Sequence, residues 1–152
     1  MVVDGKPQAL QLERIVPTQL QIQILYDLLK ARHHRISHAE MPDFETHRDF
    51  VEAHPYRVWY LVVDGQDPIG SLYIGKDNAI GINLVRDPGT AALGEVIDRV
   101  MGETRPLPPI ASVRAGYFFV NVPSGNTQLM RQLAELGFDA IQTSFMRRPG
   151  SF

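Results

Sequence analysis

Three β-prone segments follow one another in the middle of the chain, and only short turns separate them. The first covers 58–63 and is rich in β-branched and aromatic residues, and the next two cover 69–74 and about 79–85. An Asp-Gly pair at 64–65 and a Lys-Asp-Asn run at 76–78 mark the turns. Because connections this short join antiparallel neighbours, the sequence predicts an antiparallel meander.

The residues before the meander predict one strand and two helices. Apolar and polar residues at first alternate over 9–16, which indicates a strand. An apolar stripe with helical spacing predicts a helix over about 18–32, with its first threonine as a candidate N-cap. A shorter helix is expected over 44–53, where Asp43 is the candidate cap.

The residues after the meander alternate between helix and strand. Gly89 opens a predicted helix, and the proline-rich residues 102–110 must form a loop. A strand is expected at 113–122, a helix from Asn126, and a last strand at about 140–147. Such an order predicts right-handed crossovers with parallel pairing. The expected fold is therefore a mixed α/β domain, with a mixed sheet of about six strands and about four helices on its two faces.

Length and composition limit the class of protein. The chain has 152 residues, which fits a short lead-in at 1–8 and a single domain over 9–152. Hydrophobic residues make up 44% and charged residues 21%, so disordered, collagen-like and coiled-coil classes fit poorly. The formal net charge of −2 argues against a nucleic-acid partner, which usually selects a basic surface.

The sequence contains no cysteine, which excludes disulfide frameworks, thiolate zinc sites and cysteine nucleophiles. No apolar run approaches the ~20 residues that a membrane-spanning helix needs. The first residues lack a basic segment followed by an apolar one, so no signal peptide is expected. These features predict a cytoplasmic protein without a membrane partner.

Residues 86–91, Arg-Asp-Pro-Gly-Thr-Ala, stand between a predicted strand and a predicted helix. A helix N-terminus presents unpaired N–H groups and about half a positive charge, and a diphosphate can dock there. Gly89 would let the backbone approach the ligand closely, and Arg86 would add a charged hydrogen bond. Asp-Pro-Gly is also an ordinary turn sequence, so the spacing alone leaves both interpretations open.

The same residues match the (Gln/Arg)-x-x-Gly-x-(Gly/Ala) acyl-CoA signature of the GNAT-type N-acetyltransferases. Residues 65–74 are similar to the turn and Ile-Gly strand of that family, and 121–138 resemble its Val-x-x-x-Asn and Leu-Gly-Phe ending. The resemblance covers roughly residues 9–148. It implies a GNAT-like acyl-CoA acyltransferase fold.

The resemblance also implies an activity. It predicts an enzyme that transfers an acyl group, most simply acetyl from acetyl-CoA, to the amine of a small molecule such as an amino sugar or amino-acid-like metabolite. It allows a homodimer. By position in the family's pattern, the expected cofactor-binding residues are Leu84, Val85, Arg86, Gly89, Thr90, Ala91, Asn121 and Asn126.

Catalysis would need a base for the amine and an acid for the leaving thiolate. In the family the segment at 33–47 walls the acceptor site, and His38 and Glu40 are its first candidates for the base. The alternative is a solvated polar loop. The family's acid is commonly a tyrosine at the position of Leu133, so Tyr117 is the candidate substitute, or else a packed strand aromatic.

Several features leave other functions open. Four histidines lie at 33, 34, 38 and 47, but no His-Glu-x-x-His pattern exists, so no metal is predicted. Asp87 places a negative charge, and Pro88 removes a donor, beside the proposed diphosphate site. The alternative is therefore an acyltransferase-fold domain that binds a ligand or partner without catalysis. A third is an unrelated α/β interaction module.

Overall fold

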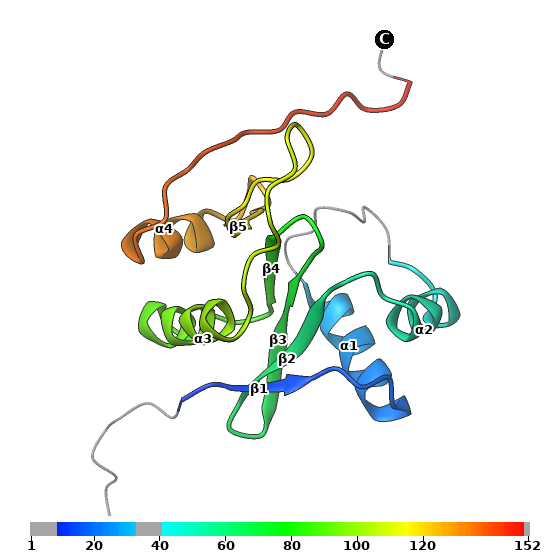
Figure 1. Cartoon of the computed structure of the whole chain (residues 1–152). Coiled ribbons are helices and arrows are strands. Elements are labelled where there is room, and N and C mark those ends of the chain that lie inside the picture. The colour runs from blue at the N-terminus through cyan, green and yellow to red at the C-terminus, as the bar shows by residue number, and fades with distance from the viewer. Residues whose placement is uncertain (1–8, 33–40, 151–152) are drawn as a thin grey trace, which may run out of the picture.

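The computed structural model describes residues 9–32 and 41–150, which form one five-stranded sheet and four helices (Figure 1). The strands lie in the order β1-β2-β3-β4-β5, and only the last pair is parallel. The strands are β1 Gln11–Arg14, β2 Val58–Asp64, β3 Asp67–Ile74, β4 Ala79–Leu84 and β5 Phe119–Val120. The helices are α1 Gln19–Ala31, α2 Phe44–Glu52, α3 Thr90–Glu103 and α4 Thr127–Glu135. The predicted mixed α/β class and the antiparallel meander are confirmed.

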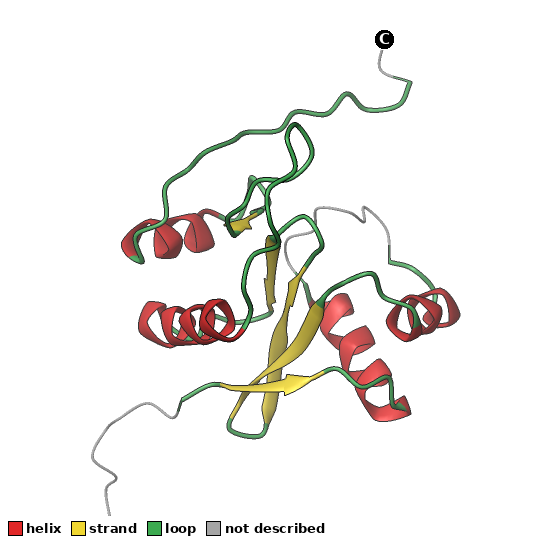
Figure 2. Ribbon diagram, in the orientation of Figure 1, coloured by secondary structure: helices red, strands yellow, loops and turns green. Residues whose placement is uncertain are grey.

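Helices cover both faces of the sheet, as Figure 2 shows. Successive strand residues point to opposite faces, so one strand supplies two cores. In β2, Val62 packs into the core that contains residues of α3 and α4, whereas Trp59 and Leu61 pack into the core with residues of α1 and α2. None of the described helices combines the length and apolar content that a membrane span requires.

Side-chain caps set the helix boundaries where the sequence predicts them. The Oγ1 of Thr18 accepts from the N–H of Gln21 at 3.2 Å, and Asp43 caps α2 in the same way. At the end of α4, Gly137 has φ 92° and the N–H of Phe138 donates to the carbonyl of Leu133 at 2.9 Å. Such a left-handed C-terminal turn favours glycine, since a Cβ would be strained there.

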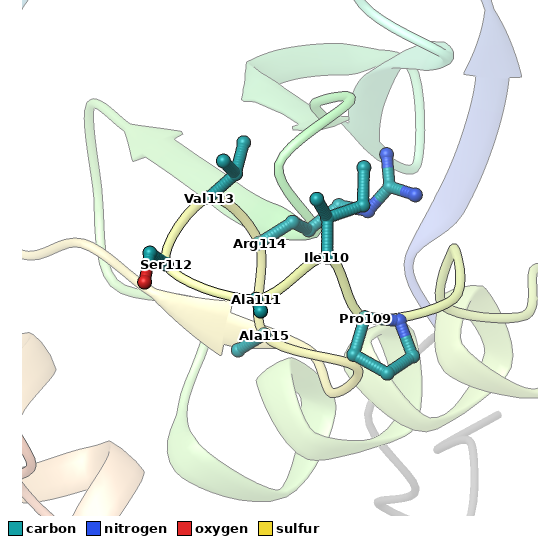
Figure 3. Close-up of a pocket in the computed structure, with 7 residues that line it drawn as sticks. All are labelled: Pro109, Ile110, Ala111, Ser112, Val113, Arg114 and Ala115. Carbon is teal, nitrogen blue, oxygen red and sulfur yellow. The ribbon is translucent and has the colours of Figure 1, made fainter.

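The predicted strand over 113–122 is wrong in extent, because only Phe119 and Val120 pair with β4. The preceding residues form a tight loop instead, in which the N–H of Ile110 donates to the carbonyl of Arg114 at 2.8 Å (Figure 3). The fully buried Asn78 fixes this loop to the sheet. Its side chain bonds both backbone groups of residue 107 and the carbonyl of residue 115. These long-range bonds compete with strand formation.

The predicted last strand at 140–147 is also wrong, because these residues belong to no helix or strand. They run extended beyond α4, and each is exposed. β-propensity alone did not form a strand here, because a strand also needs a neighbour to pair with. The sheet of the described chain therefore has five strands, not about six.

Candidate functional site

The two parallel strands separate after a short contact. β5 pairs only with the first two residues of β4, Ala79 and Ile80. On the other side of β4, the carbonyl of Ala79 accepts from the N–H of Gly75, just after β3, and the N–H of Val85 donates to the carbonyl of Ile69 in β3. In a β-strand, the N–H and C=O groups of successive residues point alternately to the two neighbouring strands. The peptide groups of residues 82 and 84 therefore point toward the side where β5 has diverged.

A cavity of about 210 Å³ lies at this divergence. The end of β4, the turn into α3 and the start of α4 all contribute to its wall. Its lining residues are Ile82, Leu84, Val85, Arg86, Asp87, Pro88, Gly125, Asn126, Thr127, Gln128, Leu129 and Gln132. The cavity therefore combines strand residues that β5 does not pair with and the turn that the sequence predicts to bind a diphosphate.

A second hollow, of about 380 Å³, lies within the single loop 109–115 (Figure 3). Its one titratable side chain is Arg114, whose guanidinium donates to the carbonyls of Pro108 at 2.8 Å and Lys76 at 3.3 Å. This arginine holds the loop in place, and the other polar side chain that lines the hollow is Ser112.

Gly89 is the N-cap residue that immediately precedes α3. Its φ of 94° lies in the left-handed region, and no side chain caps the helix from this position. A Cβ built on Gly89 would meet nothing within 4 Å, so the space above the turn is open. The first N–H groups of α3 therefore follow an open turn and receive no side-chain cap from Gly89, which suits an anion, although Glu135 accepts from the Thr90 hydroxyl at 3.3 Å beside them.

The carboxylate of Asp87 already accepts from one N–H group of this turn. It accepts from the N–H of Gly89 at 2.8 Å, from Gln128 Nε2 at 2.9 Å and from Gln132 Nε2 at 2.8 Å. The sequence showed the charge of Asp87 but not these partners. The available signal was the spacing of the two glutamines, which places them one turn apart on the same face of α4. The carboxylate thus links the turn to α4 and brings negative charge to the turn that the sequence predicts to bind a diphosphate.

Arg86 lies at the rim of the cavity and is held by the hairpin between β2 and β3. Its Nη1 lies 2.8 Å from Asp64 Oδ2, and its Nη2 lies 3.7 Å from Asp67 Oδ2. The side chain remains about half exposed, so its guanidinium can still meet an anion. The two carboxylates orient this guanidinium and also compete for it.

The structure brings together some of the predicted site residues. Leu84, Val85, Arg86 and Asn126 line the cavity, and the turn residue Gly89 and the first residues of α3, Thr90 and Ala91, stand beside it. The side chain of Asn126 caps α4, since its Oδ1 accepts from Leu129 N–H at 3.2 Å.

The other candidates lie apart from the cavity. Asn121 and Tyr117 flank β5, are exposed and do not contribute to the cavity lining. Leu133 of α4, at the position where the resemblance predicts a tyrosine, is buried in the core that residues of the sheet, α3 and α4 form together. His38 and Glu40 lie outside the described residues.

A polar and aromatic cluster lies on the opposite face of β4. Arg32 Nη2 donates to Asn83 Oδ1 at 2.8 Å, and Tyr56 and Tyr73 stack with their ring centroids 3.9 Å apart. Burial raises the pKa of Tyr56 to about 12, and it raises the pKa of Tyr73 as well. Both phenols are therefore protonated at neutral pH and can donate hydrogen bonds, although neither can serve as a base.

Metal-ligating side chains are not grouped in the described ranges. Among residues 9–32 and 41–150, no three His, Cys, Asp or Glu side chains are placed to hold a metal ion. Of the four histidines considered above, His47 is the one within these ranges. Its side chain is buried in α2 against Tyr26 of α1, and burial lowers its pKa.

Comparisons with known proteins identify the fold. No family model matches the sequence, and no curated protein matches it at a significant level. An acetyltransferase from Thermus thermophilus is similar in structure, with a TM-score of 0.63, 17% identity, and coverage of 89% of this chain and 90% of that one.

Two further solved structures agree. An aminoglycoside N-acetyltransferase, AAC(6')-Iy, in complex with CoA has a TM-score of 0.58 and 9% identity, over 98% of this chain and 99% of that one. A possible acetyltransferase from Clostridium difficile 630 has a TM-score of 0.55 and 9% identity, over 93% and 97%. The chain has the GNAT-like acyltransferase fold that its sequence predicts.

Proposed function

We propose that this protein is a CoA-dependent N-acyltransferase that moves an acetyl group from acetyl-CoA to the amine of a small molecule. The divergence of β4 and β5 beside the open N-terminus of α3 is the observation that carries the proposal. It supplies, in the cavity and in the helix N-terminus next to it, the two groups of donors that such a cosubstrate needs. The peptide groups of residues 82 and 84 can bond the amide-bearing arm of CoA, and the α3 turn can hold its diphosphate.

The reaction needs few groups from the protein. The amine nitrogen attacks the thioester carbonyl carbon, a C–N bond forms, and the C–S bond breaks. A strand N–H on β4 can donate to the carbonyl oxygen as its negative charge develops. The amine loses one proton to a base and the leaving thiolate gains one. His38 and Glu40 remain the predicted candidates for the base, and Tyr117 the predicted candidate for the acid.

The acceptor would approach from the face that carries Arg32, Asn83 and the stacked tyrosines. The cluster on this face can orient a polar molecule through hydrogen bonds, and its Arg32 directly precedes in the sequence the segment that contains the predicted bases. AAC(6')-Iy is an aminoglycoside N-acetyltransferase by name, which supports an amino sugar as one acceptor class for this chain. An amino-acid-like amine is the other class in the proposal.

Calorimetric titration with acetyl-CoA tests the binding step directly. We expect saturable binding that Arg86→Ala weakens by about 1.5–3 kcal/mol, the range for hydrogen bonds to charged groups. Arg99→Ala is the matched control, since it removes the same charge from an exposed position on α3, far along the helix from the turn. A folded protein that shows no heat of binding at millimolar acetyl-CoA would disprove the proposal.

Turnover can be measured without interference from the protein. The chain has no cysteine, so a thiol reagent reports only the free CoA that acetyl transfer releases. A panel of amino sugars and amino acids would show which amines accelerate thiol release above the rate of hydrolysis. If acetyl-CoA binds but no amine is acetylated, the chain is a ligand-binding member of the fold and the catalytic part of the proposal fails.

A further inference from the structure

The ring of Tyr73 lies across the neighbouring strand β4. Tyr73 of β3 and Gly81 of β4 stand directly opposite each other in the antiparallel register. A Cβ built on Gly81 would overlap the Cε1 and Cζ atoms of this ring and lie 2.6 Å from its hydroxyl oxygen. A glycine inside a strand often marks such a close approach, because a side chain there would exclude the neighbour. The far end of the Tyr73 side chain, with its hydroxyl, is therefore held over the backbone of β4.

The hydroxyl is held at the place where β4 and β5 separate. β5 pairs with Ala79 and Ile80, and Gly81 is the next residue along β4. The peptide N–H of residue 82, which follows, points toward the side that β5 has left. In the proposed function such a strand N–H polarises the thioester carbonyl. A thioester bound there would have its reacting atoms beside the Tyr73 hydroxyl.

The hydroxyl lies on the face of the sheet from which the acceptor would approach. Side chains on one face of a strand recur at every second residue, so Gly81 and Asn83 share a face of β4. Asn83 is the residue that accepts from Arg32, and Tyr73 packs against the core between this face, α1 and α2. Hydroxyl, amine and thioester would therefore meet beside Gly81.

Tyr56 holds the ring of Tyr73 in this position. The two rings stack with their centroids 3.9 Å apart and an interplanar angle of 11°. Tyr56 in turn packs edge-on against Trp59, with the centroids 5.2 Å apart. Ring contacts of this kind fix the orientation of an aromatic side chain. In the described part of the chain no group accepts a hydrogen bond from the Tyr73 hydroxyl, so its proton is available to a bound molecule.

The surroundings also keep this hydroxyl protonated. Burial raises the pKa of Tyr73 above its ordinary 10.0, the positive charge of Arg32 opposes this rise, and the negative charge of Asp77 adds to it. A phenol that is protonated at neutral pH can give a proton to a leaving thiolate. Leu133, at the position where the resemblance predicts a tyrosine for this task, has no proton to give and is buried in the core.

We propose that Tyr73 is the catalytic residue that protonates the leaving thiolate, in place of the exposed Tyr117 that the sequence predicts. The inference rests on the proposed acetyl transfer and assigns one of its proton steps. The amine nitrogen forms the C–N bond and gives one proton to the base. The C–S bond breaks while the Tyr73 oxygen gives its proton to sulfur. The phenolate then takes a proton from solvent, to which the base returns its own, so that one proton passes in net from nitrogen to sulfur.

Steady-state kinetics test the assignment, with acetyl-CoA and the amino sugar or amino acid that gives the fastest release of CoA. Tyr73→Phe keeps the ring over Gly81 and removes only the hydroxyl, so the fold should be retained. We expect kcat to fall by about 10²–10⁴-fold, the usual contribution of a general acid, while the Kd of acetyl-CoA from calorimetry stays at its native value. Tyr60→Phe removes a hydroxyl from the opposite face of the sheet and should keep native turnover.

The pH profile of kcat separates an acid from a residue that only shapes the site. Fluorotyrosine in place of Tyr73 lowers the pKa of the phenol and leaves its shape almost unchanged. An acid must be protonated to act, so activity is lost as the pH rises through its pKa. We expect the alkaline fall of kcat to move to lower pH in this protein. Fluorotyrosine in place of the stacked Tyr56 is the matched control and should not move it to lower pH.

The possible results separate this inference from the proposed function. A Tyr73→Phe protein with native kcat, an affinity for acetyl-CoA that falls as much as kcat, or an alkaline fall that does not follow fluorination of residue 73 would each overturn the assignment and leave the acetyl transfer standing. The same holds if Tyr117→Phe shows the expected loss and Tyr73→Phe does not. A native protein that acetylates no amine would overturn the proposed function, and this assignment with it.

Discussion

Asp87 is the residue at which the proposed cosubstrate site can be tested most sharply. Its carboxylate bonds the N–H of Gly89 and the amides of Gln128 and Gln132, so it brings a negative charge to the turn that should receive a diphosphate. Asp87→Asn removes the charge and keeps an oxygen that can accept from Gly89 and Gln132. We expect this variant to bind acetyl-CoA more tightly than the native protein.

The magnitude follows from Coulomb's law. A diphosphate oxygen bound to the first N–H groups of α3 would lie about 5 Å from a carboxylate that itself bonds Gly89 N–H. Asp87 is exposed, so a dielectric constant of about 40–80 applies. Repulsion between one unit charge and about two then amounts to roughly 1.5–3 kcal/mol. Its loss should raise the affinity about ten- to a hundredfold.

Two ligands separate this effect from a general change in the cavity. Calorimetry with acetyl-CoA should show the gain in affinity, and the gain should shrink as salt screens the charges. S-acetylpantetheine has the thioester and the amide arm but no diphosphate, so its affinity should not change. An Asp87→Asn protein that binds acetyl-CoA no more tightly, or binds both ligands equally better, would refute this account of the turn.

Three further predictions concern stability. Asn78→Ala removes the side chain that bonds three backbone groups of the loop before β5. Urea unfolding should therefore show that the free energy of unfolding falls by about 3–5 kcal/mol, and hydrogen exchange should become faster in that loop. In Gly81→Ala the new Cβ would overlap the ring of Tyr73, so thermal unfolding should show marked destabilisation, whereas Gly102→Ala, which meets nothing within 4 Å at the end of α3, should be neutral or stabilising by up to about 1 kcal/mol. Burial lowers the pKa of His47 below its ordinary 6.5, so the unfolded chain binds more protons than the folded one at acid pH. The free energy of unfolding should therefore fall as the pH drops below about 6.5. Urea titrations from about pH 5 to 8 should show that His47→Asn reduces this dependence of the free energy of unfolding on pH.

The helices and the meander could be predicted because their signals are local. Thr18 and Asp43 each cap a helix through an N–H three residues away, and the glycine at 65 adopts the positive φ of a two-residue turn. Such contacts span a few residues, so sequence periodicity and turn chemistry are sufficient to reveal them. The strand at 113–122 and the strand at 140–147 were predicted wrongly, because pairing depends on a partner that propensity does not identify.

The candidate site shows the same division. The sequence by itself determined that a strand leads into a glycine turn and then a helix, since residues 84–91 carry that order in their own chemistry. The tertiary structure alone decided what surrounds the turn. Asp87 meets its two glutamines across 41 and 45 residues, and Arg86 meets Asp64 across 22. Contacts at such separations follow from how α4 and the β2–β3 hairpin pack around β4, and no short window of sequence contains that packing.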